Sequence, residues 1–128
     1  MKVIYLNDLD GKAYIVQKSA DETSISFIQT LVGGLFDCVS LNDDTDIWIH
    51  DEGFFMSGYG VNETASFLSG RMLMGPAVIA GNDDGATVEV GGVYLTIMAL
   101  NYDQKTYTAD EVVAIRTKQF GEVVSGVR

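Results

Sequence analysis

The chain has 128 residues, of which 47% are hydrophobic and 20% are charged. This balance is typical of one packed globular domain rather than of a disordered chain. No apolar run approaches the roughly 20 residues that cross a bilayer, and the four apolar residues after Lys2 are too few for the core of a signal peptide. We therefore expect a single domain, residues 1–128, in a cytoplasmic protein.

The formal net charge is −10, and its distribution is uneven. Between Ala20 and Gly70 there is no lysine or arginine. A surface of this kind repels phosphate, which excludes direct nucleic-acid binding and an anionic membrane, and it predicts a partner with a basic surface. Solubility alone is the other explanation. The nine acids of this block are Asp21, Glu22, Asp37, Asp43, Asp44, Asp46, Asp51, Glu52 and Glu63.

The first third of the chain predicts a hairpin and a helix. Lys2–Leu6 and Ala13–Gln17 read as strands joined through Asp10-Gly11, which is a strong turn signal. A helix follows, capped by Thr23 or Ser24, because hydroxyl side chains satisfy the first free amides of a helix. Gly33 ends it in the left-handed conformation. Its apolar face is predicted to comprise Ile25, Ile28, Leu31 and Val32.

The middle of the chain predicts two antiparallel strands, Phe36–Leu41 and Asp46–His50, and a second helix. In the second strand Ile47 and Ile49 should face one side and Trp48 and His50 the other. The helix is predicted to begin at Asn62 and to end at Gly70. The residues expected to face the sheet from this helix are Ala65, Phe67 and Leu68.

The last third predicts three short strands, Ala77–Ala80, Thr87–Val90 and Val93–Leu100, with a turn over Asn82–Gly85. Thr108 and Glu111 have the spacing of a capping box, which starts a helix predicted to run to about Gln119 and to close at Gly121. Val112, Ile115 and Phe120 should point inward from this helix. Strands and helices do not alternate one for one, which predicts an α+β fold with a mostly antiparallel sheet and two or three short helices packed on it.

No motif predicts catalysis, a metal or a cofactor. The single cysteine, Cys38, excludes an internal disulfide and is expected to be a half-buried structural thiol. The single histidine, His50, precedes Asp51 and Glu52, but adjacent residues of an extended chain point to opposite faces, so the three cannot converge. The acids from Asp43 to Asp46 lack the glycine and the distal glutamate of a calcium loop. An enzyme is the least favoured class.

Four aromatic residues lie in one stretch of twelve residues inside the acid-rich block, and they are the candidates for partner binding. Carboxylates around aromatic side chains are typical of protein-binding surfaces, whereas each aromatic residue taken singly fits a core position as well. Because carboxylates in turns bury little, joint replacement of the five acids by Asn or Gln should leave folding intact; they are Asp43, Asp44, Asp46, Asp51 and Glu52. The candidate partner-binding residues are Trp48, Asp51, Glu52, Phe54, Phe55, Tyr59, Asp43, Asp44 and Asp46.

Four segments in sequence resemble a known family. They are the run from Leu31 to Leu41 with its Gly33-Gly34 pair, the strand that ends in Asp51-Glu52-Gly53, the helix start Asn62-x-x-Ala65, and Gly75–Gly81. Their order and spacing are similar to the small proteins catalogued as domain of unknown function 3846, most clearly over residues 31–85. The resemblance implies a bacteriophage or mobile-element setting in the host cytoplasm and no established activity. The aromatic stretch Phe54–Gly60 departs from the family pattern.

These observations predict a small acidic accessory protein that binds a host protein for takeover or counter-defence. One alternative is a DNA mimic that inhibits a DNA-binding host protein, which requires the acids to line up on one face. Another is a sequestering protein for a small nucleotide signal, with phosphate met by Arg71, Arg116 and Lys118 between subunits of a homo-oligomer.

Overall fold

The computed structural model describes residues 1–92 and 105–124. In this part of the chain seven strands form one sheet with the order β3-β4-β5-β1-β2-β7, and β6 pairs with β5. The strands are β1 (Lys2–Leu6), β2 (Ala13–Gln17), β3 (Phe36–Asn42), β4 (Thr45–His50), β5 (Ala77–Asp83), β6 (Ala86–Val88) and β7 (Thr106–Tyr107). All pairs are antiparallel except β2 with β7, so the predicted α+β class is confirmed.

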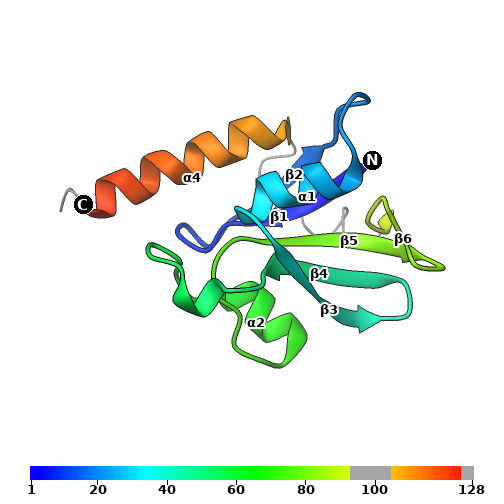
Figure 1. Cartoon of the computed structure of the whole chain (residues 1–128), viewed down its shortest axis with the longest axis horizontal. Helices are drawn as coiled ribbons and strands as arrows, with labels where there is room; N and C mark the ends of the chain where they lie inside the picture. Colours follow the sequence, from blue (N-terminus) through cyan, green and yellow to red (C-terminus); the bar gives the residue numbers. More distant parts are fainter. Residues whose placement is uncertain (93–104, 125–128) are drawn as a thin grey trace.

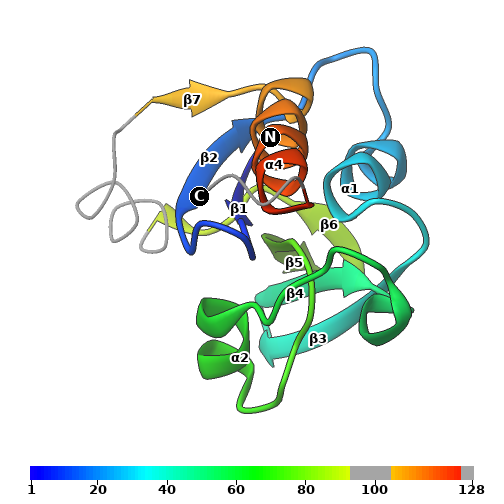
Figure 2. The same cartoon turned by 90° about the vertical axis from the view of Figure 1, so that its left-hand side faces the viewer.

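Helices cover both faces of the sheet (Figures 1 and 2). On one face lie α1 (Ser24–Val32) and α4 (Ala109–Val124), which pack with Val3, Tyr5 and Val78. On the other face α2 (Glu63–Ser69) contributes Ala65 to a second cluster with Ile4, Ile47 and Ile79. Successive residues of a strand alternate between these clusters, as the pleat requires. Among the described residues no helix is both long and apolar enough to cross a membrane.

The predicted helix ends are largely confirmed. The Thr23 side chain accepts a hydrogen bond from the Ser26 amide, the Asn62 side chain accepts one from the Ala65 amide, and Gly33 and Gly70 end their helices with positive φ. Thr108 and Glu111 form the reciprocal bonds of a capping box. Local hydrogen-bonding chemistry decides these positions, which is why the sequence reveals them.

Several predicted orientations are wrong. Ile25 is 61% exposed, because the buried stripe of α1 consists of Phe27, Ile28, Leu31 and Val32 and Ile25 lies at its margin. Phe67 is 77% exposed, since it lies two residues, or about 200° of helix, beyond buried Ala65. Leu68 is also exposed.

Three predicted boundaries change as well. Gly121 does not close α4, which continues to Val124. Strand β5 extends to Asp83, so the following turn is centred on Asp84 and Gly85, both with positive φ, and β6 covers only Ala86–Val88. The predicted strand Val93–Leu100 lies outside the described residues.

Candidate protein-binding surface

The short 3₁₀ helix η1 (Gly53–Phe55) presents two large aromatic side chains to solvent. Phe54 is 62% exposed and Phe55 is 87% exposed. The Phe55 amide donates to the Glu52 carbonyl at 2.9 Å, which closes the turn. Gly53 is buried so close to Met74 that an added Cβ would lie 2.8 Å from the Met74 carbonyl oxygen. The turn is thus held against the chain at its first residue, while the next two point outward.

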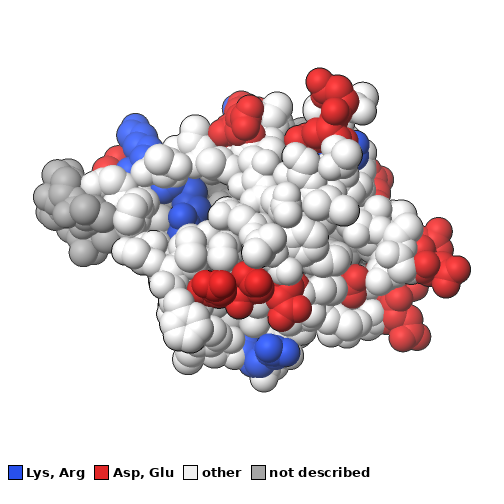
Figure 3. Space-filling model, viewed as in Figure 1, with Lys and Arg blue, Asp and Glu red and all other residues white. Residues whose placement is uncertain are grey.

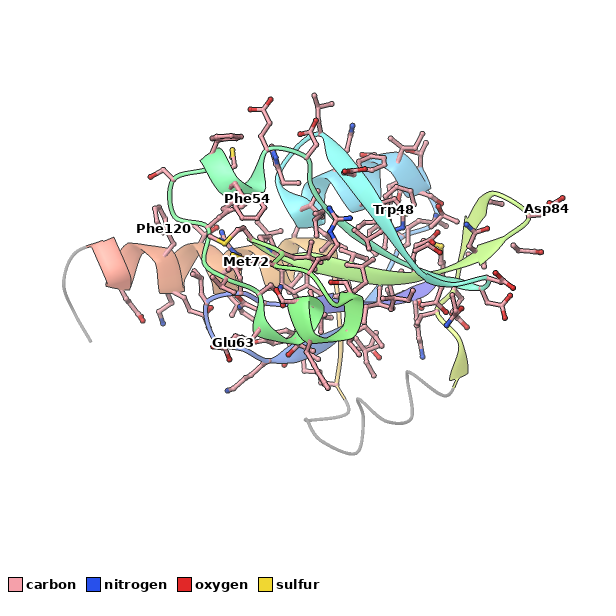
Figure 4. The ribbon with its side chains drawn as sticks, turned by 90° about the horizontal axis from the view of Figure 1, so that it is seen from below. Trp48, Phe54, Glu63, Met72, Asp84 and Phe120 are labelled. Atoms are coloured by element: carbon pink, nitrogen blue, oxygen red, sulfur yellow. The ribbon has the colours of Figure 1, made fainter. Side chains whose placement is uncertain are left out.

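Two exposed acids, Asp51 and Glu52, come directly before η1. His50 is nearly buried and accepts a hydrogen bond from the Glu52 amide at Nδ1, 3.0 Å away, with the Asp51 carboxylate 3.5 Å from the same nitrogen. His50 therefore shapes the turn. Met72, in the segment after α2, is also 61% exposed, and Figure 4 shows the side chains of Phe54 and Met72. We call Asp51, Glu52, Phe54 and Phe55 the acid–aromatic surface.

Tyr59 connects this surface to the core. Its hydroxyl donates to the Val32 carbonyl at 2.6 Å, next to the end of α1. Its ring meets the His50 ring edge-on at 5.8 Å, and the guanidinium carbon of Arg116 lies 4.8 Å from its centroid. Burial raises the pKa of the Tyr59 hydroxyl. Tyr59 therefore positions the segment after η1 and is not part of the exposed surface.

A buried ion pair holds the same segment from the other side. Arg116 on α4 donates through Nε and Nη2 to the two carboxylate oxygens of Asp8, at 2.6 and 2.8 Å. Nη2 also donates to the Gly58 carbonyl, and the Gly60 amide donates to Asp8. The Asp8 side chain is 0% exposed and that of Arg116 is 15% exposed. Burial opposes the charge of Arg116, but bonding to Asp8 prevails and raises its pKa.

Comparison with known proteins identifies a family for most of the chain. A family model described as domain of unknown function (DUF3846) matches residues 1–94. The chain belongs to this family. No curated protein and no solved structure is similar enough to this chain to count as a match. The DUF3846 match ends before α4, so Arg116 lies outside the matched residues.

The predicted acids of the β3–β4 hairpin are divided between surface and interior. Asp43 and Asp44 are exposed at the turn. Asp46 is only 5% exposed and accepts a hydrogen bond from the Asn82 side chain at 2.9 Å. The premise that all these carboxylates bury little is therefore wrong for Asp46, whereas the effect of neutralising them on folding stays a prediction. Asp83 and Asp84, at the neighbouring hairpin, add to the exposed acids at this end of the sheet, and Figure 3 shows the acids in separate groups.

Trp48 is half-buried and packs edge-on against Phe36, with ring centroids 4.9 Å apart. It belongs to the sheet rather than to the acid–aromatic surface. Cys38, its cross-strand neighbour, is exposed, which corrects the expectation of a half-buried residue. Its sulfur is partly desolvated, and burial together with the Asp46 carboxylate raises the pKa of the thiol to about 12. A thiol with that pKa stays protonated at neutral pH and is a poor nucleophile.

The three predicted phosphate-binding residues do not converge on one cavity. Arg116 lines a cavity of about 70 Å³ together with Tyr5 and Tyr59, to which Arg71 and Lys118 do not contribute. Arg71 follows α2, whereas Lys118 is two residues from Arg116 on α4 and hence on a different helix face. A larger hollow of about 280 Å³ lies between the Asn7–Gly11 loop and the start of α2. No group of histidine, cysteine and acidic residues in the described ranges could hold a metal ion.

Sequence reasoning missed the Asp8–Arg116 pair and the exposure of Met72. A signal for Arg116 was available, because Val112, Arg116 and Phe120 are spaced by four and share a helix face, so an inward arginine needed a buried partner. Nothing in the sequence named Asp8 as that partner, since the two residues are 108 positions apart. No local sequence pattern indicated that Met72 would be exposed.

Proposed function

We propose that this protein is a non-enzymatic module that binds another protein through the acid–aromatic surface. The observation that carries the proposal is the exposure of Phe54 and Phe55, at 62% and 87%, beside the exposed carboxylates of Asp51 and Glu52. Leaving a large aromatic side chain in water forgoes roughly 1.5–3 kcal/mol of burial free energy. Aromatic residues in such positions frequently dominate binding energy once a partner covers them.

The acids of this surface indicate the charge of the partner. No lysine or arginine occurs from Ala20 to Gly70, so Asp51 and Glu52 have neither residue type among their sequence neighbours. Carboxylates at the margin of an interface mainly accelerate association and fix orientation. We therefore propose a partner whose contact surface carries lysine or arginine around an apolar patch.

The biological setting of the proposal comes from the resemblance of the sequence to a phage and mobile-element family. In that setting the protein is an accessory protein acting in the host cytoplasm, and its partner is a host protein bound for takeover or counter-defence. The DNA-mimic and nucleotide-sequestering alternatives stay predictions, and no specific observation favours either. The acids occupy opposite ends of β4, and Arg116 is already engaged by Asp8.

Affinity capture from host lysate tests the proposal. Wild type is compared with F54A/F55A and with two control variants, I25A and F67A, which each remove an equally exposed apolar side chain elsewhere. We expect a partner captured by the wild type to be lost from F54A/F55A and retained by both controls. A partner retained by F54A/F55A as well as by the wild type would contradict the proposed surface.

The association rate with the captured partner tests the charge argument. We expect D51N/E52Q to slow association by about tenfold at low salt, with a smaller loss as salt shortens the screening length. The control, D83N/D84N, removes two exposed carboxylates at the other hairpin and should have a much smaller effect. Equal slowing by both variants would indicate a general charge effect rather than a contact surface.

A further inference from the structure

Strand β3 is the terminal strand of the sheet. Within residues 1–92 and 105–124 it pairs with β4 and with no other strand, and Figure 2 shows it at the margin of the sheet. It has seven residues, of which Asp37, Cys38, Ser40 and Asn42 are exposed. A terminal strand of this length carries a row of backbone groups that a further strand can bond.

The register identifies which backbone groups face outward. The Asp51 amide donates to the Leu35 carbonyl at 3.0 Å, so Leu35 belongs to a hydrogen-bonded pair with Asp51. Such pairs alternate along an antiparallel ladder, which places the backbone groups of Asp37 and Val39 toward β4. The amide and carbonyl groups of Phe36, Cys38 and Ser40 therefore point away from the sheet.

One of these outward amides is already occupied. The Cys38 amide donates to the carboxylate of Asp37 at 2.8 Å. A charged side chain on an outer strand is a common device against unwanted strand pairing. Because Asp37 is exposed, its carboxylate can turn to an approaching cation and release the Cys38 amide. A neutral or acidic strand cannot draw the Asp37 carboxylate away from the Cys38 amide. Asp37 therefore favours the pairing of basic strands over other strands.

The charges along this edge agree with that discrimination. Asp51 and Glu52 lie beside the start of β3, Asp37 lies within it, and Asp43 and Asp44 follow its end. Pairing with a second copy of this chain would bring these carboxylates against their own equivalents. An extended segment that carries lysine or arginine would instead meet opposite charge beside both ends of β3 and at Asp37.

We propose that β3 accepts an extended, basic segment of the partner protein as an added strand. In this mode main-chain hydrogen bonds to Phe36, Cys38 and Ser40 supply affinity, and Asp37 selects a basic residue on the same face. The inference rests on the proposed function, because it names how that partner is recognised. It concerns β3, whereas the proposed function depends on Phe54 and Phe55.

A peptide titration of the ¹⁵N-labelled protein tests the proposal. The probe is a blocked seven-residue peptide that alternates lysine and valine. The two control peptides carry glutamate in place of lysine, or a central proline with the lysines kept. We expect the lysine–valine peptide alone to slow hydrogen exchange of the Phe36, Cys38 and Ser40 amides by about tenfold or more, since those amides gain a partner.

Two variants sharpen the test. S40P removes an outward amide without touching the ladder to β4, and we expect it to weaken peptide binding about tenfold or more. D37K keeps every backbone group and reverses the charge, and it should abolish binding of the lysine–valine peptide even if S40P does not fold. The control D110K changes an exposed acid at the start of α4 and should bind almost as the wild type does.

Three outcomes would overturn the proposal. The first is equal protection by the glutamate or proline peptide. The second is peptide-induced change confined to Phe54, Phe55 and their neighbours, with β3 unaffected. The third is concentration-dependent protection of β3 without peptide, accompanied by dimers in sedimentation, which would assign the edge to a second copy. None of these outcomes decides the F54A/F55A capture experiment, which tests the proposed function independently.

Discussion

Two adjacent parts of the molecule reverse the usual distribution of side chains. On one side of the Met56–Gly60 segment, the charged side chains of Asp8 and Arg116 are largely buried and hydrogen-bonded to each other. On the other side, Phe54 and Phe55 are exposed. Within five residues, from Phe54 to Tyr59, the chain passes from side chains that only face solvent to one held by α1, His50 and Arg116.

This contrast assigns two different roles to the two sides of the loop. The buried polar groups fix the backbone, because an unpaired charge in that position is costly and the bonded geometry is therefore strongly preferred. The exposed aromatic residues contribute little to the fold and remain available for contact. A surface held in place before binding loses less conformational entropy on association, so a stable attachment to α4 would favour the proposed binding.

The largest effect is expected from removing the buried arginine. R116M leaves the Asp8 carboxylate buried without its partner, and we expect the free energy of unfolding to fall by about 3–5 kcal/mol. Urea denaturation followed by circular dichroism measures it. The double variant D8N/R116M removes both charges and should recover part of the loss. A loss below about 1 kcal/mol for R116M would mean that the pair does not hold the loop.

Smaller changes in the free energy of unfolding are expected from substituting two tyrosines of the same region, and the two changes should differ in sign. Y59F removes the bond to the Val32 carbonyl and should lower the free energy of unfolding by about 1–2 kcal/mol. Tyr5 is 0% exposed, and its hydroxyl has no hydrogen-bond partner among the described residues. Y5F should therefore be neutral or stabilising by up to about 1 kcal/mol. Equal destabilisation by both would show that the Tyr5 hydroxyl is bonded after all, for instance by water.

The smallest effect on stability is expected from the exposed aromatic residues. F54A and F55A remove side chains that bury little area, so the free energy of unfolding should change by no more than about 0.5 kcal/mol each. The same urea titration measures this change. Destabilisation above about 1.5 kcal/mol would show that the aromatic residues pack in the native state, which would remove the contrast with Arg116.

Much of the fold follows from local sequence. The Asp10-Gly11 hairpin, the caps at Thr23 and Asn62 and the capping box at Thr108 involve groups within a few residues of one another. Their hydrogen-bonding chemistry is the same in any fold, so short patterns predict them. The alternation of Ile47 and Ile49 against Trp48 in β4 was predictable for the same reason.

Helix faces were harder to predict, because helical periodicity shows where apolar residues recur but not which of them meets the sheet. In α2 only Ala65 is buried, and the larger Phe67 and Leu68 stay outside. Gly121 continues α4 because its φ is not positive and no turn requires it there.

The sequence by itself determined the class of fold, the helix starts and the concentration of acids and aromatic residues between positions 20 and 70. Only the tertiary structure decided which of those residues reach solvent, burying Asp46 and engaging Tyr59 while leaving Phe54 and Phe55 exposed. It also joined Asp8 to Arg116 and left the outer edge of β3 without a paired strand among the described residues. The physical reason is distance along the chain. Burial and ion pairing depend on residues brought together from far apart, whereas caps, turns and periodicity depend on neighbours.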